Sequence, residues 1–302
     1  MSLVAPFTAL VLAALPAPPT EDVADRVRHG TAVNGDVELH YAALGEAGEV
    51  VVLLHGFPDY WYTWRHQMAG LADRFRVVAP DLRGYNRSGK PAGVDAYAMR
   101  HLMADVEAVV LAQGVERATI VGHDWGAAVA WNFAMWYPHR VDRLGILSVP
   151  HPSGFARELA ENDEQRTNSQ YARDFQEDGA HESLTARGLA AWVTDDAARA
   201  RYVAAFGRSD IEAMLHYYKA NYPKPSAATA ASPPGWKRIT APTLVLHGMK
   251  DRYLHHRGHA YCWEWIDAET SIVMLPEAGH FLQQDRPERV TRLLREWLLR
   301  PR

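Results

Sequence analysis

The stretch VGHDWGAA, residues 121–128, decides the fold of this chain. The residues just before it, ATIVG at 118–122, have the apolar character of a buried β-strand. The residues after it, AAVAWNFAMW at 127–136, have the composition of a helix, and Pro138 follows them. A strand that runs through a short turn into a helix therefore surrounds the carboxylate of Asp124.

Two glycines flank this carboxylate, Gly122 and Gly126, each two positions away from Asp124. A tight turn between a strand and a helix leaves no room for side chains at these positions, and glycine tolerates its backbone angles. Such a turn, the nucleophile elbow, raises the central side chain above the end of the sheet. It also directs the backbone N–H of the next residue, Trp125, toward the reacting atom.

Other apolar runs alternate with helical patterns along the chain. The expected strands are 50–54, 75–81, 118–122, 143–149, 241–248 and 270–276, and the expected helices are 61–74, 97–113, 127–136 and 287–299. This alternation predicts an α/β fold with a mostly parallel central sheet and helices on both faces.

The alternation stops between about Pro152 and Arg238, where the chain is polar, helix-like and without a convincing strand. An interruption of this length is expected to be functional rather than a bare loop. We therefore predict an α/β core made of residues 1–151 and 239–302, with an inserted helical cap at 152–238.

The composition bounds the class of protein. The 302 residues are 48% hydrophobic and 23% charged, with a net charge of −4, so neither nucleic acid nor an anionic membrane is an expected partner. The single cysteine, Cys262, excludes an intrachain disulfide and fits a reducing compartment. The apolar segment 3–15 is too short to span a bilayer, and no basic residue precedes it as in an export signal. We expect an apolar arm on a cytoplasmic protein, with a cleaved export signal as the alternative. The sequence leaves monomer and homodimer open.

Three more features follow predicted strands in the order that a hydrolytic triad on this fold requires. Asp251 ends the run TLVLHGMKD, and His280 lies in LPEAGHF, just after the next strand. Upstream, HGFP at 55–58 follows the first strand, so the backbone N–H of Phe57 is expected to join that of Trp125 in an oxyanion hole. Each residue alone has an ordinary structural explanation, but their common place at strand ends favours a nucleophile, an acid and a histidine.

Four stretches closely resemble the α/β-hydrolase-fold epoxide hydrolases: HGFPDYWYTWRHQM at 55–68, DLRGYNRSGKP at 81–91, GHDWGAAVAW at 122–131 and AGHFLQQDRPE at 278–288. The resemblance runs from about residue 30 to the end and is weakest in the predicted cap. It implies the α/β-hydrolase fold and an enzyme that uses a small-molecule epoxide and water. Asp124 is already ionised at neutral pH, because a carboxyl group titrates near about 3.9. It can attack an alkyl carbon and form an ester, which water activated by His280 and Asp251 then hydrolyses. This route needs neither cofactor nor metal.

The resemblance also assigns the acids that open the ring. The segments SQYARDFQEDG and MLHYYKANY resemble the cap segments that carry two ring-opening tyrosines in epoxide hydrolases, which implies Tyr171 and Tyr218. The adjacent Tyr217 competes with Tyr218 for this role and is otherwise a candidate pocket residue. The other candidate pocket residues are His55, Pro58 and Trp61, although Trp61 has an equally good explanation as a packing residue in the helix 61–74.

Two alternatives remain at this point. Haloalkane and haloacetate dehalogenases share HGFP and GHDWG, and they use the same first step. Phe57 stands where haloalkane dehalogenases commonly carry Asn, and Trp125 stands where fluoroacetate dehalogenases carry Arg. A non-catalytic binding protein of this fold would be expected to have a degraded triad. Finally, the spacing in LHHRGHAYC allows metal binding by His255, His256, His259 and Cys262, but a helix packed on the core is the favoured interpretation.

Overall fold

An eight-stranded sheet organises the computed structural model, which describes residues 22–223 and 236–301. The strands are β1 (Arg28–Asn34), β2 (Val37–Leu44), β3 (Val50–Leu54), β4 (Arg76–Pro80), β5 (Ala118–His123), β6 (Val141–Leu147), β7 (Thr243–Gly248) and β8 (Thr270–Leu275). Their order across the sheet is β1-β2-β4-β3-β5-β6-β7-β8. The six strands β3 to β8 run parallel, while β2 pairs antiparallel with both β1 and β4.

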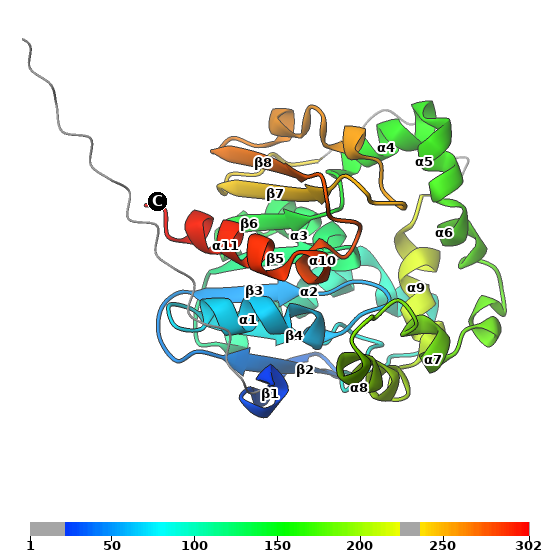
Figure 1. Ribbon diagram of the computed structural model, residues 1–302, viewed down its shortest axis with the longest axis horizontal. Helices are drawn as coiled ribbons and strands as arrows, with labels where there is room; N and C mark the ends of the chain where they lie inside the picture. Colours follow the sequence, from blue (N-terminus) through cyan, green and yellow to red (C-terminus); the bar gives the residue numbers. More distant parts are fainter. Residues whose placement is uncertain (1–21, 224–235, 302) are drawn as a thin grey trace, which may run out of the picture.

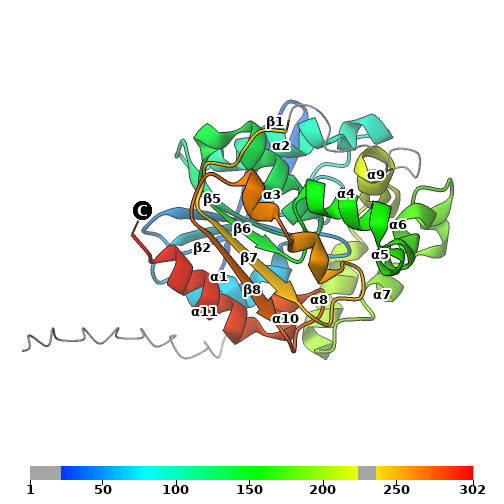
Figure 2. The same cartoon turned by 90° about the horizontal axis from the view of Figure 1, so that it is seen from above.

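Helices cover both faces of this sheet (Figure 2). One face carries α1 (Arg65–Leu71) and α11 (Pro287–Leu298), which pack against each other, together with the short α10 (Leu282–Asp285). The other face carries α2 (Met99–Ala112) and α3 (Trp125–Trp136). The central strands are buried on both sides, since all residues of β3, β5 and β7 are buried. The predicted α/β fold with a mostly parallel, doubly covered sheet is therefore confirmed.

The expected core elements form with shifts of a few residues at their ends. The predicted helix 61–74 is shorter than expected, because residues 61–64 form a 3₁₀ turn before α1 begins. The hairpin β1–β2 was not predicted. Its first strand shows only one buried residue, Ala32, so it lacks an apolar run. The signal was instead the two-residue turn Gly35-Asp36, a combination typical of tight hairpins, with Gly35 at a φ of +58°.

Between β6 and β7 the described residues contain helices and no strand. These are α4 (Pro152–Glu161), α5 (Asp163–Asn168), α6 (Gln170–Asp174), α7 (Ala186–Leu189), α8 (Asp196–Phe206) and α9 (Ile211–Asn221). They gather beyond the carboxyl ends of the parallel strands (Figure 1). The boundaries 151/152 and 238/239 stay a prediction. The segment 3–15 lies outside the described residues, and within those residues no helix is long and apolar enough to cross a membrane.

Candidate active site

Asp124 occupies a strained turn between β5 and α3. Its φ of +51° and ψ of −124° lie outside the regions that residues with a side chain normally adopt. The two glycines explain how the turn fits. A Cβ on Gly122 would collide with the backbone of Gly126, and a Cβ on Gly126 would collide with the carbonyl of Leu54 at the end of β3. The strand, turn and helix therefore form the geometry expected from residues 121–128.

The two oxygens of Asp124 face different partners. The backbone N–H of Phe57 donates to Oδ1 over 2.7 Å, and Nε2 of His280 lies 3.3 Å from Oδ2. Phe57 follows β3, and β3 neighbours β5 at the point where the order of the sheet reverses. Such switch points are where ligands bind in open α/β sheets. One oxygen is thus held by the backbone while the other faces the imidazole.

The imidazole of His280 bridges two carboxylates. Its Nδ1 lies 2.8 Å from Oδ2 of Asp251, which follows β7. The other oxygen of Asp251 accepts hydrogen bonds from the backbone N–H groups of Tyr253 and Leu254, at 2.8 and 3.1 Å. All three predicted triad residues therefore come together, although their roles stay a prediction.

The opposite charges of the two carboxylates and the imidazole lower the pKa values of Asp124 and Asp251 and raise that of His280. Burial alone would raise the pKa of Asp124, but the hydrogen bond and charge of His280 outweigh it and lower that pKa below the usual value. Burial would also raise the pKa of Asp251, but the charge and hydrogen bond of His280 lower it below its usual value. Burial alone would lower the pKa of His280, but the two carboxylates raise it to about 10. The resting group is consequently a cationic imidazole between two anions.

Two backbone N–H groups are candidates for an oxyanion hole. Phe57 already donates to Asp124. Trp125 is the first residue of α3, and N–H groups in the first turn of a helix have no partner within the helix. These are the two donors expected from the sequence. Their alignment with a tetrahedral intermediate on Asp124 is an expectation rather than an observed contact.

Aromatic side chains from the helices between β6 and β7 stand over this group. Tyr218 in α9 has its ring 5.0 Å from that of Trp125 and 5.6 Å from that of Phe57, measured between centroids. Tyr171 in α6 lies 6.1 Å from Tyr218. Burial, together with the nearby charge of Asp124, holds the pKa of Tyr171 well above 10. The pKa of Tyr218 is also held well above 10, by its burial and by the neighbouring Tyr171 and Asp124. Both hydroxyls are therefore protonated at neutral pH and can donate.

Tyr217 faces elsewhere. Its hydroxyl donates to the backbone carbonyl of Arg83 over 2.9 Å, and its ring lies against Tyr85 and Tyr97. The guanidinium of Arg83 forms a buried ion pair with Asp105. The ring of Tyr217 also lies 5.8 Å from that of Trp125, but its hydroxyl is occupied by the carbonyl of Arg83, so the geometry favours Tyr218 for the second role.

The remaining pocket candidates have structural partners. His55 is fully buried, and its Nε2 accepts the backbone N–H of Leu82 while its Nδ1 lies 2.8 Å from the carbonyl of Gly56. Burial lowers its pKa to about 4, so it is neutral. The ring of Trp61 contacts His29, Tyr60 and Tyr62, which favours packing. Pro58 is half-buried next to Phe57. Their place in the pocket stays a prediction.

Two aromatic residues near the triad were missed. The ring of Tyr253 lies 5.1 Å from that of His280 and 5.3 Å from that of Tyr171. The ring of Phe175 lies 5.3 Å from both Phe57 and Tyr218. The signal for Tyr253 was its position two residues after Asp251 in MKDRYL. Phe175, four residues after Tyr171, had the spacing of the same helix face.

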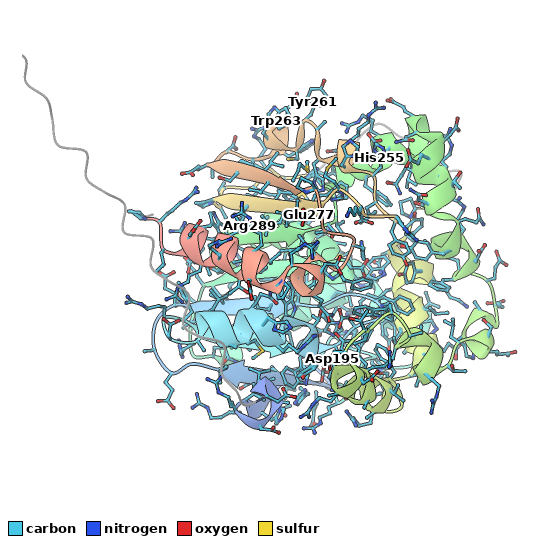
Figure 3. All side chains as sticks on the ribbon, in the orientation of Figure 1. Asp195, His255, Tyr261, Trp263, Glu277 and Arg289 are labelled. Carbon is cyan, nitrogen blue, oxygen red and sulfur yellow. The ribbon has the colours of Figure 1, made fainter. Side chains whose placement is uncertain are left out.

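The segment 255–262 was expected to be a helix, but it forms two 3₁₀ turns, His256–His259 and Cys262–Trp265. The ring of His259 is buried against His247, and Cys262 is also buried. Within residues 22–223 and 236–301, no three His, Cys, Asp or Glu side chains are grouped so as to hold a metal ion. Tyr261 and Trp263 in this segment are 56% and 49% exposed and point outward (Figure 3).

A doubly covered parallel sheet with an aspartate elbow, a following acid and a following histidine defines the class of α/β hydrolases. Residues 49–287 match the family model described as alpha/beta hydrolase fold, so the chain belongs to that family. Within it, the chain belongs to the epoxide hydrolases, as the resemblance of its motifs predicted. It is 31% identical to epoxide hydrolase 3 of Xenopus tropicalis, over 87% of this chain and 75% of that protein.

Two further relatives support this assignment. Epoxide hydrolase A of Mycobacterium tuberculosis is 32% identical over 93% of this chain and 97% of that protein. The crystal structure of the Bacillus megaterium epoxide hydrolase in complex with an inhibitor has a TM-score of 0.84 and 30% identity, covering 90% of this chain and 100% of that chain.

Proposed function

We propose that this protein hydrolyses an epoxide to a vicinal diol through an ester on Asp124. The observation that carries the proposal is the position of this carboxylate, with the imidazole of His280 on one side and the aromatic cluster of Tyr171 and Tyr218 on the other. The relatives named above are epoxide hydrolases, and they match along most of the chain.

In the first step Oδ2 of Asp124 attacks a ring carbon, and the bond from that carbon to the epoxide oxygen breaks. Tyr171 and Tyr218 donate hydrogen bonds to the oxygen as it becomes an alkoxide, and one of them transfers its proton there, to be reprotonated in the second step. Oδ1 continues to accept the hydrogen bond from the N–H of Phe57 and becomes the carbonyl oxygen of the ester. The developing charge is thus placed between two acids whose pKa values keep them protonated.

In the second step His280 takes a proton from water, and the hydroxide attacks Cγ of Asp124. The N–H groups of Phe57 and Trp125 stabilise the oxyanion. When it collapses, the bond from Cγ to the alkyl oxygen breaks, and that oxygen takes the proton of His280 and leaves as the second hydroxyl of the diol. Asp124 is left as a carboxylic acid, and its proton returns to the tyrosine that gave one up. Asp251 holds the imidazole through Nδ1 and stabilises its positive charge. The sum is one epoxide and one water converted to one diol. Side chains and water supply every group in these steps, so no cofactor is proposed.

We also propose that residues 152–238 act as a cap over the core made of residues 1–151 and 239–302. The contacts of Tyr218 in α9 with Phe57 and Trp125 support this division, because they cross from one part to the other. The single cysteine supports a cytoplasmic location, where thiols remain reduced. Size-exclusion chromatography with light scattering distinguishes monomer from homodimer.

The covalent route is tested by trapping the ester. In His280→Gln the attack by Asp124 is kept while water activation is lost, so the intact mass should rise by that of one epoxide. His139→Gln, at an exposed position outside the site, is the control and should turn over without accumulating an adduct. The covalent route is wrong if no adduct forms with any epoxide that the unmodified enzyme converts. Release of halide from haloalkanes, without diol formation from epoxides, would instead establish a dehalogenase.

A further inference from the structure

The backbone carbonyl of His280 accepts two hydrogen bonds from buried side chains. Nε2 of His123 lies 2.9 Å from this oxygen, and Oγ of Ser148 donates to it over 2.7 Å. His123 is the last residue of β5, and Ser148 directly follows β6. His280 itself lies in the connection between β8 and α10. The two strand ends beside the elbow therefore hold the loop that carries the predicted base.

The backbone of Ser148 is held by three polar contacts. Its backbone N–H donates to the carbonyl of Leu246 over 2.9 Å, and its own carbonyl faces Nδ1 of His247 at 3.0 Å and Nε2 of His259 at 3.2 Å. Its φ of +69° is one that serine rarely adopts. Such backbone strain persists only where the surrounding structure determines it. The result is a hydroxyl aimed at one acceptor, the carbonyl of His280.

His123 has a defined role in this pair. Burial, and then the charge of His280, lower its pKa to about 3, so the ring is neutral and carries one N–H. A carbonyl oxygen cannot donate, so that proton is on Nε2 and points at His280. Nδ1 is then an acceptor, and the side chain of Gln283 donates to it over 3.2 Å. Gln283 fixes the tautomer that supports the carbonyl of His280.

We propose that His123 and Ser148 are positioning residues that fix the backbone of His280, so that its Nε2 stays between Asp124 and the hydrolytic water. This inference rests on the proposed function. It also has a consequence specific to one step, because His280 acts as a base only when the ester is hydrolysed. Misplacement of a catalytic group by about 1 Å can reduce a rate by about a hundredfold. Loss of either hydrogen bond to the carbonyl of His280 should therefore slow hydrolysis of the ester and leave its formation unchanged.

The test uses Ser148→Gly, which removes the hydroxyl while glycine adopts the φ of +69° without strain. Rapid quenching with intact-mass detection, on an epoxide that the unmodified enzyme converts, gives the two rate constants separately. We expect ester formation within about twofold of the unmodified enzyme and hydrolysis slower by about tenfold or more, so the adduct accumulates. Ser153→Ala is the matched control, because its hydroxyl pairs with His151 and not with His280. It should change neither step.

A second pair of variants tests the hydrogen bond from His123 to the carbonyl of His280. Gln places an amide N–H near the position of Nε2, so His123→Gln should retain more of the hydrolysis step than His123→Leu. Equal loss of both steps in Ser148→Gly, or no loss in either, would overturn the inference. A parallel fall in both steps with a lower melting temperature is the result that a merely structural role produces.

One measurement needs no substrate. The imidazole N–H protons of His280, observed by proton NMR, should broaden or shift in Ser148→Gly as the ring loses its fixed place between Asp251 and Asp124. Unchanged signals would overturn the positioning role. The His280→Gln trapping experiment reports separately on the proposed function. If no epoxide yields an adduct there, the covalent mechanism fails while the NMR result still decides whether Ser148 positions the ring.

Discussion

Asp124 combines a strained backbone with two differently used oxygens. Oδ1 accepts the N–H of Phe57, and Oδ2 faces His280, so the carboxylate is presented in one orientation. A serine at this place would have to lose a proton to the imidazole before it attacked. The aspartate needs no such deprotonation, so the imidazole remains available to activate water. The attack on the substrate and the hydrolysis of the ester therefore use different side chains.

The two cap tyrosines are distinguished by substitution. Tyr218→Phe should reduce turnover of epoxides by about a hundredfold, the lower end of the range for loss of a general acid, because a second acid remains. Tyr217→Phe should reduce it only slightly, since its hydroxyl is bonded to the carbonyl of Arg83. Steady-state rates of diol formation measure both. A larger loss in Tyr217→Phe would reassign the second acid.

The rate of the second step should depend on pH through His280. Its pKa of about 10 in the resting site reflects two facing carboxylates, and ester formation removes the charge of Asp124. The pKa of the imidazole therefore falls in the ester, and hydrolysis requires its neutral form. We expect the hydrolysis rate constant to rise with pH and then level below about pH 10, whereas ester formation stays flat above about pH 5. Stopped-flow tryptophan fluorescence separates the steps. A hydrolysis rate that falls with rising pH contradicts this assignment.

The sequence predicted Asp124, Asp251 and His280 because each follows an apolar run that ends at the same edge of a parallel sheet. It could not separate Tyr217 from Tyr218, since adjacent residues in a helix point about 100° apart and only the packing of α9 decides which one faces the site. Ser148 was also out of reach. Its role depends on a positive φ and on a contact with a residue 132 positions further along the chain.

At the scale of elements, the elbow depends on how closely α3 approaches the end of β3. A Cβ on Gly126 would meet the carbonyls of Leu54 and His55, which are backbone atoms and cannot rotate away. Parallel pairing of β3 with β5 holds those carbonyls in place. The site is therefore formed by strand pairing as much as by its catalytic side chains.

Gly126→Ala should destabilise the protein by about 1–3 kcal/mol, the usual range for overpacking a filled interior, and should abolish turnover by displacing Asp124. The control is Gly207→Ala, at the end of α8. Its φ is −66°, and a Cβ there would make only ordinary contacts. Urea unfolding gives both free energies. Unchanged stability and activity in Gly126→Ala would show that the turn has more room than its geometry indicates.

The elements themselves were predictable to the degree that they are buried. The run that became β3 is apolar throughout, those that became β5 and β7 are mostly apolar, and all residues of the three strands are buried. The edge strand β1 is mostly exposed, so its sequence shows no such run. The predicted helix at 255–262 became two 3₁₀ turns, because the side chains of His259 and Cys262 are buried while Tyr261 adopts a φ of +68° between them.

At the scale of the whole molecule, a buried acid joins the core to the helices above it. Asp59 is fully buried, and its Oδ1 accepts hydrogen bonds from the hydroxyl of Tyr202 in α8, at 2.7 Å, and from the N–H of Tyr60, at 2.9 Å. The side chain of Gln284 donates to the same tyrosine hydroxyl over 2.8 Å. Burial raises the pKa of Asp59 to about 7, although these hydrogen bonds oppose the shift.

This acid should make the stability depend on pH. The native state keeps a proton that the unfolded chain releases from a carboxyl group with a pKa of 3.8, so stability falls as pH rises from about 4 to about 7. Asp59→Asn is neutral at every pH and keeps an acceptor for Tyr202. Its melting temperature should exceed that of the unmodified protein by several degrees at pH 8 and differ little at pH 4. A difference that does not change with pH would contradict the assignment.

The division of labour between the two parts of the chain has a practical consequence. The acids proposed to assist ring opening lie between β6 and β7, whereas Asp124 and the groups proposed to hydrolyse its ester follow strands of the core. Replacing residues 152–238 with the corresponding region of a relative should therefore change which compound is accepted and which of its enantiomers reacts. The lifetime of the ester, once formed, should be inherited from this protein. Selectivity and turnover would then be adjustable by separate rounds of engineering on separate segments of one gene.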